Sequence, residues 1–460
     1  MHNFELAINN LDDFVFGSAP HPVQCGRGVI IGAGHVLPEI NFTLPPMEIR
    51  DETWGQVIGE YREMITGVCQ RACDLGVPQL LVEFETLPPM TVHPEWGAEV
   101  TRLLADILDR FYADHGLRSA LRLTPNDSRD HERPPHMRSG FYWDGMKRLF
   151  SMAGKAGADL LAIESTGGKE IHDDALMNAD IEKMVFALGI LASRDMRFLW
   201  AEIVSACKDQ GIVPSGDTAC GFANTALAMA EQKMLPRVFA ALVRVASVPR
   251  SLTAYECGAV GPGKDCGYEN VYIKAITGAP ISMEGRSASC AHLSGLGNIA
   301  QAMCDCWSNE SVQNVRLLSA QAPVVSMEQL AFDCRMMNVA IDHSREDALR
   351  LRDWSVESDA GSDPQAWVLR PDVVIRLSRE IMKEHTDYLR TRRAVLITLE
   401  ELKRARDTGD LNILATEAKW LDRMSKQADK LPEDEEGFIA DMMIKLKDAP
   451  YLPQEYGLCK

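Results

Sequence analysis

The stretch from residue 79 to residue 163 decides the fold. Three short apolar runs of this stretch are typical of buried strands, and two helix-patterned segments separate them. The runs are QLLVEF at 79–84, SALRLT at 119–124 and DLLAI at 159–163, and the helical segments are 97–115 and 139–156. Strands that alternate with helices pair in parallel through crossover connections, so the stretch predicts an α/β fold.

The same rhythm extends in both directions from this stretch. Further strands are predicted at 198–203, 212–213, 252–255, 280–283 and 315–318, and further helices at 56–75, 180–193, 222–231, 237–246, 296–307 and 327–341. About eight strands with intervening helices fit a (β/α)8 TIM barrel. An open, doubly wound parallel sheet is the alternative.

The composition changes at both ends of the predicted barrel. Residues 1–55 contain many Gly and Pro residues between short apolar runs, which indicates an N-terminal extension with a hairpin. We place the barrel at 56–345. Residues 346–460 form a predicted helical C-terminal segment, with a long charged helix at 371–406 and further helices at 412–430 and 433–447.

The charge balance limits the classes of partner. The net charge is −18, from 48 basic and 66 acidic side chains, and such a surface repels phosphate backbones and anionic lipids. The N-terminal residues lack the basic and apolar regions of a signal peptide. Twelve cysteines are scattered without a disulfide pattern. We therefore expect a cytoplasmic protein that binds neither nucleic acid nor a membrane.

In a TIM barrel, catalytic groups project from the carboxyl ends of the strands. Glu164 follows the run LLAI, Cys220 lies in SGDTACGF after another predicted strand, and Cys266 lies in the Gly-rich loop 258–270. A carboxylate and two thiolates can bind zinc and leave a fourth position open. Their spacing matches no local zinc motif, so a loop-capping glutamate and buried structural thiols are the competing interpretation.

Several other polar groups are weaker candidates. Those near predicted strand ends, suited to supporting the site or donating a proton, are Glu83, Glu85, Asp217, Glu256 and Cys257. Cys290 and His292 are candidates for the barrel mouth or a metal, whereas Cys69, Cys73, Cys304 and Cys306 are expected in helices and the core.

Four longer motifs resemble one known family. They are LAIESTGGKE at 161–170, SGDTAC at 215–220, AVGPGKDCGYEN at 259–270 and CDCWSNE at 304–310. They are similar to the zinc-containing methanol–corrinoid methyltransferase subunits of methylotrophic methanogens and acetogens, and the resemblance covers nearly the whole chain. It implies a TIM barrel with added helices and a zinc ion held by Glu164, Cys220 and Cys266. Cys257 is a nearby alternative thiol whose context fits the family's ligand loop less well.

The resemblance also implies the chemistry. Methyl transfer from methanol to Co(I) of a corrinoid requires hydroxide to leave, and zinc supplies the Lewis acid that stabilises the charge on its oxygen. Asp217, Glu256 and Asp265 are the expected proton sources. The corrinoid is expected on a partner protein docked at the barrel mouth. The charged C-terminal helices suit a homodimer interface within a larger complex, or equally a solvated helix layer.

Three other functions stay open at this point. The first is the same transfer from another methyl donor, such as a methoxylated compound. The second is a zinc barrel hydrolase or lyase that uses zinc-bound water without a corrinoid partner. The third is a non-catalytic assembly subunit.

Overall fold

The barrel predicted from the sequence is present in the computed structural model, which describes residues 5–265, 267–284, 311–318 and 322–458. The strands are β3 (Leu37–Phe42), β4 (Gln79–Glu85), β5 (Arg118–Thr124), β6 (Leu160–Ile163), β7 (Val213–Asp217), β8 (Gly263–Asp265), β9 (Ile281–Glu284) and β10 (Ser311–Leu318). They form one sheet of eight parallel strands in the order β7-β6-β5-β4-β3-β10-β9-β8.

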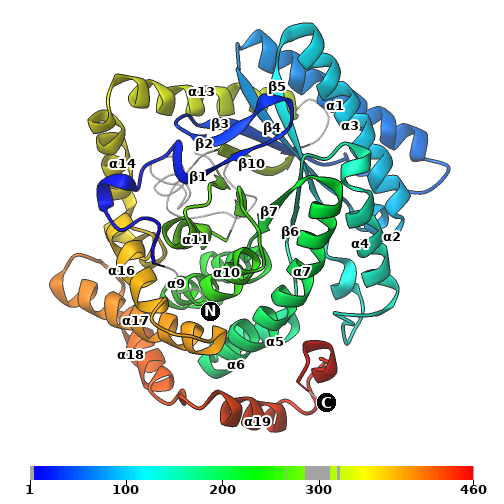
Figure 1. Ribbon diagram of the computed structural model, residues 1–460. Coiled ribbons are helices and arrows are strands. Elements are labelled where there is room, and N and C mark those ends of the chain that lie inside the picture. Colours follow the sequence, from blue (N-terminus) through cyan, green and yellow to red (C-terminus); the bar gives the residue numbers. More distant parts are fainter. Residues whose placement is uncertain (1–4, 266, 285–310, 319–321, 459–460) are drawn as a thin grey trace.

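The two ends of this strand order meet, which closes the sheet into a barrel. The amide of Val260 donates to the carbonyl of Pro214 (2.9 Å), and the amide of Gly261 donates to the carbonyl of Ser215 (2.8 Å). These bonds join the segment that leads into β8 to strand β7. The helices form a ring around the strands (Figure 1). The α/β barrel prediction is confirmed.

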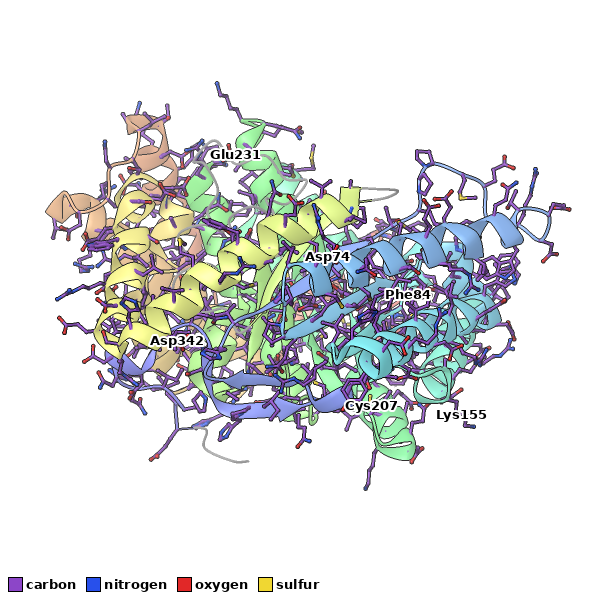
Figure 2. All side chains as sticks on the ribbon, turned by 90° about the horizontal axis from the view of Figure 1, so that it is seen from above. Asp74, Phe84, Lys155, Cys207, Glu231 and Asp342 are labelled. Carbon is purple, nitrogen blue, oxygen red and sulfur yellow. The ribbon has the colours of Figure 1, made fainter. Side chains whose placement is uncertain are left out.

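The helices that cover the barrel bury either one face or nearly all of their residues. They are α1 (Trp54–Asp74), α2 (Pro88–Val92), α3 (Pro94–His115), α4 (Gly140–Met152), α5 (Lys169–Asn178), α6 (Ile181–Phe186), α7 (Ser193–Gln210), α8 (Thr225–Glu231), α9 (Arg237–Ala246), α10 (Val248–Glu256), α11 (Asn270–Thr277) and α13 (Ala322–His343). In α1 the buried residues Val57, Tyr61 and Met64 recur every three or four positions, as an amphipathic helix requires. Phe84 of β4, which is labelled in Figure 2, meets this face, and the centroid of its ring is 5.3 Å from that of Tyr61.

Two predicted strands are helical. Residues 198–203 lie in α7 and residues 252–255 lie in α10. In α7 the buried side chains Met196, Leu199, Trp200 and Ile203 follow the helical period. A short apolar run does not by itself separate a buried strand from a buried helix, and here helical packing prevails.

Two barrel strands lie where no strand was predicted. β3 carries Glu39 and Asn41, which are buried and break the apolar pattern of a strand. β8 has three residues within a Gly-rich segment. The predicted start of the barrel was residue 56, but its first strand begins at Leu37.

The N-terminal hairpin covers the amino ends of the strands. β1 (Ser18–Gln24) and β2 (Ile30–Ala33) are antiparallel. Val29 and Ile31 of this hairpin form a separate apolar cluster with Leu37, Leu81, Ala120 and Leu160, which lie at or near the starts of four barrel strands. The hairpin closes the floor of the barrel, at the end opposite the carboxyl ends of the strands.

The C-terminal segment is helical, as predicted, but its long helix is divided. The helices are α14 (Arg345–Asp359), α15 (Pro364–Trp367), α16 (Pro371–Ile381), α17 (Asp387–Thr408), α18 (Ala415–Ala428) and α19 (Glu435–Lys445). Thr386 begins α17, because its hydroxyl accepts the amide of Leu389 (3.2 Å) and caps a new helix. The predicted helix at 296–307 lies outside the described residues. Among those described, no helix combines the length and the apolar character needed to cross a bilayer.

Candidate active site

The barrel interior is charged above its apolar floor. The Arg122 guanidinium of β5 pairs with Glu39 of β3 and donates to the Ser282 hydroxyl of β9 (2.9 Å). It also donates to the carbonyl of Pro262 (3.1 Å). Glu39 and Ser282 belong to strands that are not neighbours of β5, and Pro262 directly precedes β8, so the contacts cross the interior. Arg122, Glu39 and Ser282 are fully buried, and together they fill the middle of the barrel.

Above this layer, Lys264 lies among three carboxylates. Its ammonium is 3.0 Å from an oxygen of Glu83 and 3.0 Å from an oxygen of Glu164, and it also pairs with Glu85. Lys264 and Glu83 are buried, whereas Glu85 and Glu164 are partly exposed. The lysine thereby connects β8 with the ends of β4 and β6.

The buried Glu83 carboxylate is held in its charged form. Burial alone would raise its pKa, but the charges of Lys264 and Arg122 and the hydrogen bond from Thr124 (2.6 Å) outweigh that effect. The pKa of Glu83 therefore lies below its usual value. A permanent negative charge below the mouth keeps Lys264 in place.

Glu164 is the first residue after β6, and its side chain is 33% exposed. The loop that follows it is fixed by hydrogen bonds. The amide of Ser165 donates to Asp217 (3.2 Å), and the amide and hydroxyl of Thr166 donate to Asp127 (2.8 and 2.9 Å). The loop presents the Glu164 carboxylate at the mouth.

Cys220 begins a π-helical turn after β7, Cys220–Asn224, and is partly exposed. The side-chain amide of Asn224 donates to the sulfur of Cys220 (3.5 Å). Because β6 and β7 are neighbours, with Ile163 opposite Asp217, Glu164 and Cys220 follow adjacent strand ends. The structure brings two of the three predicted ligands to the same part of the mouth.

Cys266 lies outside the described residues, but both of its flanks are placed. Lys264 contacts Glu164 on one side. On the other side, the amide of Gly267 donates to the Thr218 hydroxyl (3.3 Å), and the amide of Ala219 donates to Glu269 (2.6 Å). A Cβ on Gly267 would be 3.1 Å from the backbone of Ala219, so glycine permits this close approach. The segment after Cys266 is thus held against the segment before Cys220.

Asp217, a predicted proton source, is fully buried and accepts several hydrogen bonds. Besides Ser165, its donors are the amide of Thr218 (2.7 Å), the indole of Trp200 (3.1 Å) and the guanidinium of Arg250 (3.3 Å). These contacts fix the ends of β6 and β7 relative to each other. The geometry gives Asp217 an anchoring part in the site.

Glu256 ends α10 and Cys257 follows it, where the chain packs against α7 and α17. Glu256 accepts hydrogen bonds from Arg390 (2.6 Å) and Arg197 (3.3 Å). The sulfur of Cys257 is 3.8 Å from the carbonyl of Arg197, and burial raises the pKa of this thiol. The structure brings neither residue to the Glu164 loop. Asp265, in contrast, ends β8 at the mouth, opposite Met283 of β9.

The remaining candidates are placed as follows. Cys69 is buried in α1 against the core and Cys73 is partly buried on the same helix, as predicted. Cys290, His292, Cys304 and Cys306 lie outside the described residues. Within the part of the chain that the structure describes, no three His, Cys, Asp or Glu side chains gather in a metal-binding group.

The ion network that supports the Glu164 loop was not predicted from the sequence. Asp127 and Asp195 both pair with the buried guanidinium of Arg129, at 2.8 Å each. Asp127 follows β5, so the same attention to strand ends would have selected it. Asp195 comes from the start of α7, and no local signal links it to the mouth.

Comparisons with known proteins agree with one another. Residues 2–457 match the family model described as the methanol-cobalamin methyltransferase B subunit. The chain is 36% identical over 458 residues to the methanol–corrinoid protein co-methyltransferase of Methanosarcina barkeri, and the match covers 98% of both chains. It also superposes on a chain of the methanol:cobalamin methyltransferase complex from the same species, with a TM-score of 0.91, 34% identity and 99% of each chain covered.

Proposed function

The chain belongs to the family of methanol–cobalamin methyltransferase B subunits, and from that premise we propose that it transfers the methyl group of methanol to Co(I) of a corrinoid. The corrinoid is carried by a partner protein. The solved relative is itself a methyltransferase complex, which supports the need for a partner. The carboxyl ends of the barrel strands, where Glu164 and Cys220 lie, are the expected docking side.

We propose that zinc is held by Glu164, Cys220 and Cys266. The observation that carries this proposal is the convergence of their loops: Glu164 and Cys220 follow adjacent strands, and both flanks of Cys266 contact these two loops. A carboxylate with two thiolates is a donor set that suits zinc. When bound, zinc supplies a Lewis acid that makes hydroxide a better leaving group.

The residues around these ligands orient them and balance their charge. Lys264 places a buried positive charge beside Glu164, which offsets part of the negative charge of the ligand set. Asp217 fixes the amide of Ser165, next to Glu164, and Glu269 fixes the amide of Ala219, next to Cys220. Outer partners of this kind hold ligands in the geometry that a metal needs.

A proton must reach the leaving hydroxide, and Asp265 is our proposed source. It ends β8 and directly precedes Cys266 in the sequence. Of the three acidic residues predicted for this role, Asp217 is held by its anchoring hydrogen bonds, and Glu256 is bonded to Arg390 and Arg197. Asp265 ends a strand at the mouth, and it is therefore the candidate that we retain for this role.

The decisive experiment compares two cysteine variants. Cys220→Ala is expected to lose bound zinc and methyl transfer together, because it removes a ligand. Cys257→Ala is the matched control, because this thiol lies beside the carbonyl of Arg197 in α7 and is not one of the proposed ligands, and it should keep both. The measurements are metal content and methylation of a Co(I) corrinoid on its carrier protein, with methanol and with a methoxylated donor in parallel. Full methanol-dependent activity in zinc-free Cys220→Ala would refute the proposal.

A further inference from the structure

The last turn of the chain packs against the loops of the barrel mouth. A 3-10 turn, Pro453–Tyr456, follows α19. Glu455 accepts the amide of Arg138 (2.6 Å) and the hydroxyl of Ser139 (2.9 Å), in the segment after β5. Arg194, near the start of α7, donates to the carbonyl of Gly457 (3.0 Å). Figure 1 shows this turn, in red, beside the green helix α5.

Tyr456 reaches from this turn into the loop that carries Glu164. Its ring is fully buried. Its hydroxyl accepts the amide of Gly168 (3.0 Å) and donates to the carboxylate of Glu170 (2.8 Å). Gly168 is the N-cap of α5 and ends the loop that starts at Glu164. The first amides of a helix have no partner within the helix, so the tyrosine satisfies a group that would otherwise be buried without one.

The loop has little room to move at this point. Gly168 has a φ of 83°, and a Cβ there would lie 2.9 Å from the carbonyl oxygen of Ala187. A Cβ on Gly167 would lie within 2.5 Å of the Asp195 carboxylate. The loop is therefore pressed between the π-helical turn that precedes α7, the ion network of Arg129 and the Tyr456 hydroxyl. Asp217 and Asp127 fix its first half, and Tyr456 fixes its last residue.

We propose that Tyr456 is a positioning residue for the methyl-transfer site, whose hydroxyl fixes the Gly168 end of the loop and thereby the orientation of Glu164. This inference rests on the proposed function, because it concerns Glu164 as a zinc ligand. Tyr456 acts from 288 residues away along the chain. Burial raises the pKa of its acceptor Glu170 to about 7, and burial also holds the pKa of the Tyr456 hydroxyl well above its usual value, so the tyrosine keeps the proton that it donates.

The test is Tyr456→Phe, which keeps the buried ring and removes the hydroxyl. Zinc affinity, measured by competition with a chelator, is expected to fall on the order of 10-fold, as for other partners that orient a metal ligand. The kcat for methylation of the corrinoid protein should fall, while the KM for methanol changes little. Tyr388→Phe is the matched control, because it removes another buried tyrosine hydroxyl, bonded to the carbonyl of Pro432 (2.6 Å), away from the loop. It should lower the melting temperature and leave zinc affinity unchanged.

A second variant covers the case in which Tyr456→Phe does not fold. Glu455→Ala loosens the same turn without touching the tyrosine, and it should weaken zinc binding in the same direction but less. Zinc affinity within twofold of wild type in both variants, or in Glu455→Ala when the other is unfolded, would overturn the positioning role. Failure of the proposed function looks different, because the wild-type protein would then bind no zinc and methylate no corrinoid.

Discussion

Lys264 shows how a single residue ties the barrel mouth to its interior. It contacts Glu83 below and Glu164 above, so the position of a proposed metal ligand depends on a buried ion pair. Removing one partner of a buried pair leaves an uncompensated charge, which is far more costly than losing a surface pair. The position of Glu164 at the mouth therefore depends on charged groups that are buried in the barrel core.

His172 is a second buried group whose charge state matters. Among the described residues, neither of its ring nitrogens has a hydrogen-bond partner, and its ring packs edge-on against Phe222, with 5.0 Å between the ring centroids. Burial, and then the charges of Lys169 and Arg250, lower its pKa to about 3. The imidazole is thus neutral in the folded protein at neutral pH.

This arrangement predicts acid sensitivity. The unfolded chain binds a proton at His172 below about pH 6.5, whereas the folded protein does not until about pH 3, so stability falls as the pH falls through this window. At pH 5 the loss is about 2 kcal/mol. His172→Phe should remove this part of the pH dependence, as measured by urea unfolding at pH 5 and pH 7. The exposed His385, changed to Gln, is the control; an equal acid dependence in wild type and His172→Phe would contradict the prediction.

Among the elements, the N-terminal hairpin carries the clearest prediction. Ile31 is fully buried in the barrel floor, and its neighbour Ile30 is 41% exposed. Ile31→Ala should cost about 2–5 kcal/mol of stability, and Ile30→Ala should cost about 0.5 kcal/mol or less. Zinc affinity should not change in either variant, because the floor lies at the opposite end from Glu164. A loss of zinc in Ile31→Ala at a temperature where it is folded would argue against this separation.

The elements also show what the sequence could and could not reveal. The runs at 79–84, 119–124 and 159–163 have the apolar side chains of buried strands, and each is a strand. β3 escaped notice because Glu39 and Asn41 are buried inside the barrel, where ion pairs take the place of apolar packing. The run at 198–203 is helical because Met196, which precedes it, continues the helical face that Leu199 and Ile203 form within it. The sequence did not predict β3 and β8, and it predicted strands at 198–203 and 252–255 that are helical. The two kinds of error were equal in number, so the predicted number of barrel strands was right.

At the scale of the whole molecule, Glu256 joins the barrel to the C-terminal helices. It accepts hydrogen bonds from Arg197 of α7 and Arg390 of α17. We expect Glu256→Gln to keep methyl transfer within twofold and to lower stability by about 1.5–3 kcal/mol, the usual value for charged hydrogen bonds. Asp265→Asn should do the reverse, with slower methyl transfer and similar stability. Loss of activity at full stability in Glu256→Gln would restore this residue as the proton source.

Only the site residues that follow a strand directly in the sequence could be predicted from the strand pattern. Glu164 and Cys220 follow strand runs, and a strand end in a barrel indicates function. Selecting them among other carboxylates and twelve cysteines required the longer motifs of the family resemblance. Tyr456 gives no such signal, because its relation to Gly168 exists only after the helical segment has folded around the barrel.

The order of Tyr456 and the Glu164 loop along the chain has a consequence for biosynthesis. The barrel strands and the proposed ligands are all made before Tyr456, and domains begin to fold from the N-terminus during synthesis. Tyr456 leaves the ribosome 288 residues after Gly168, so a nascent chain first holds Glu164 on a loop whose contact with the tyrosine does not yet exist. The loop is thereby fixed at both ends only in chains that have been translated past Tyr456.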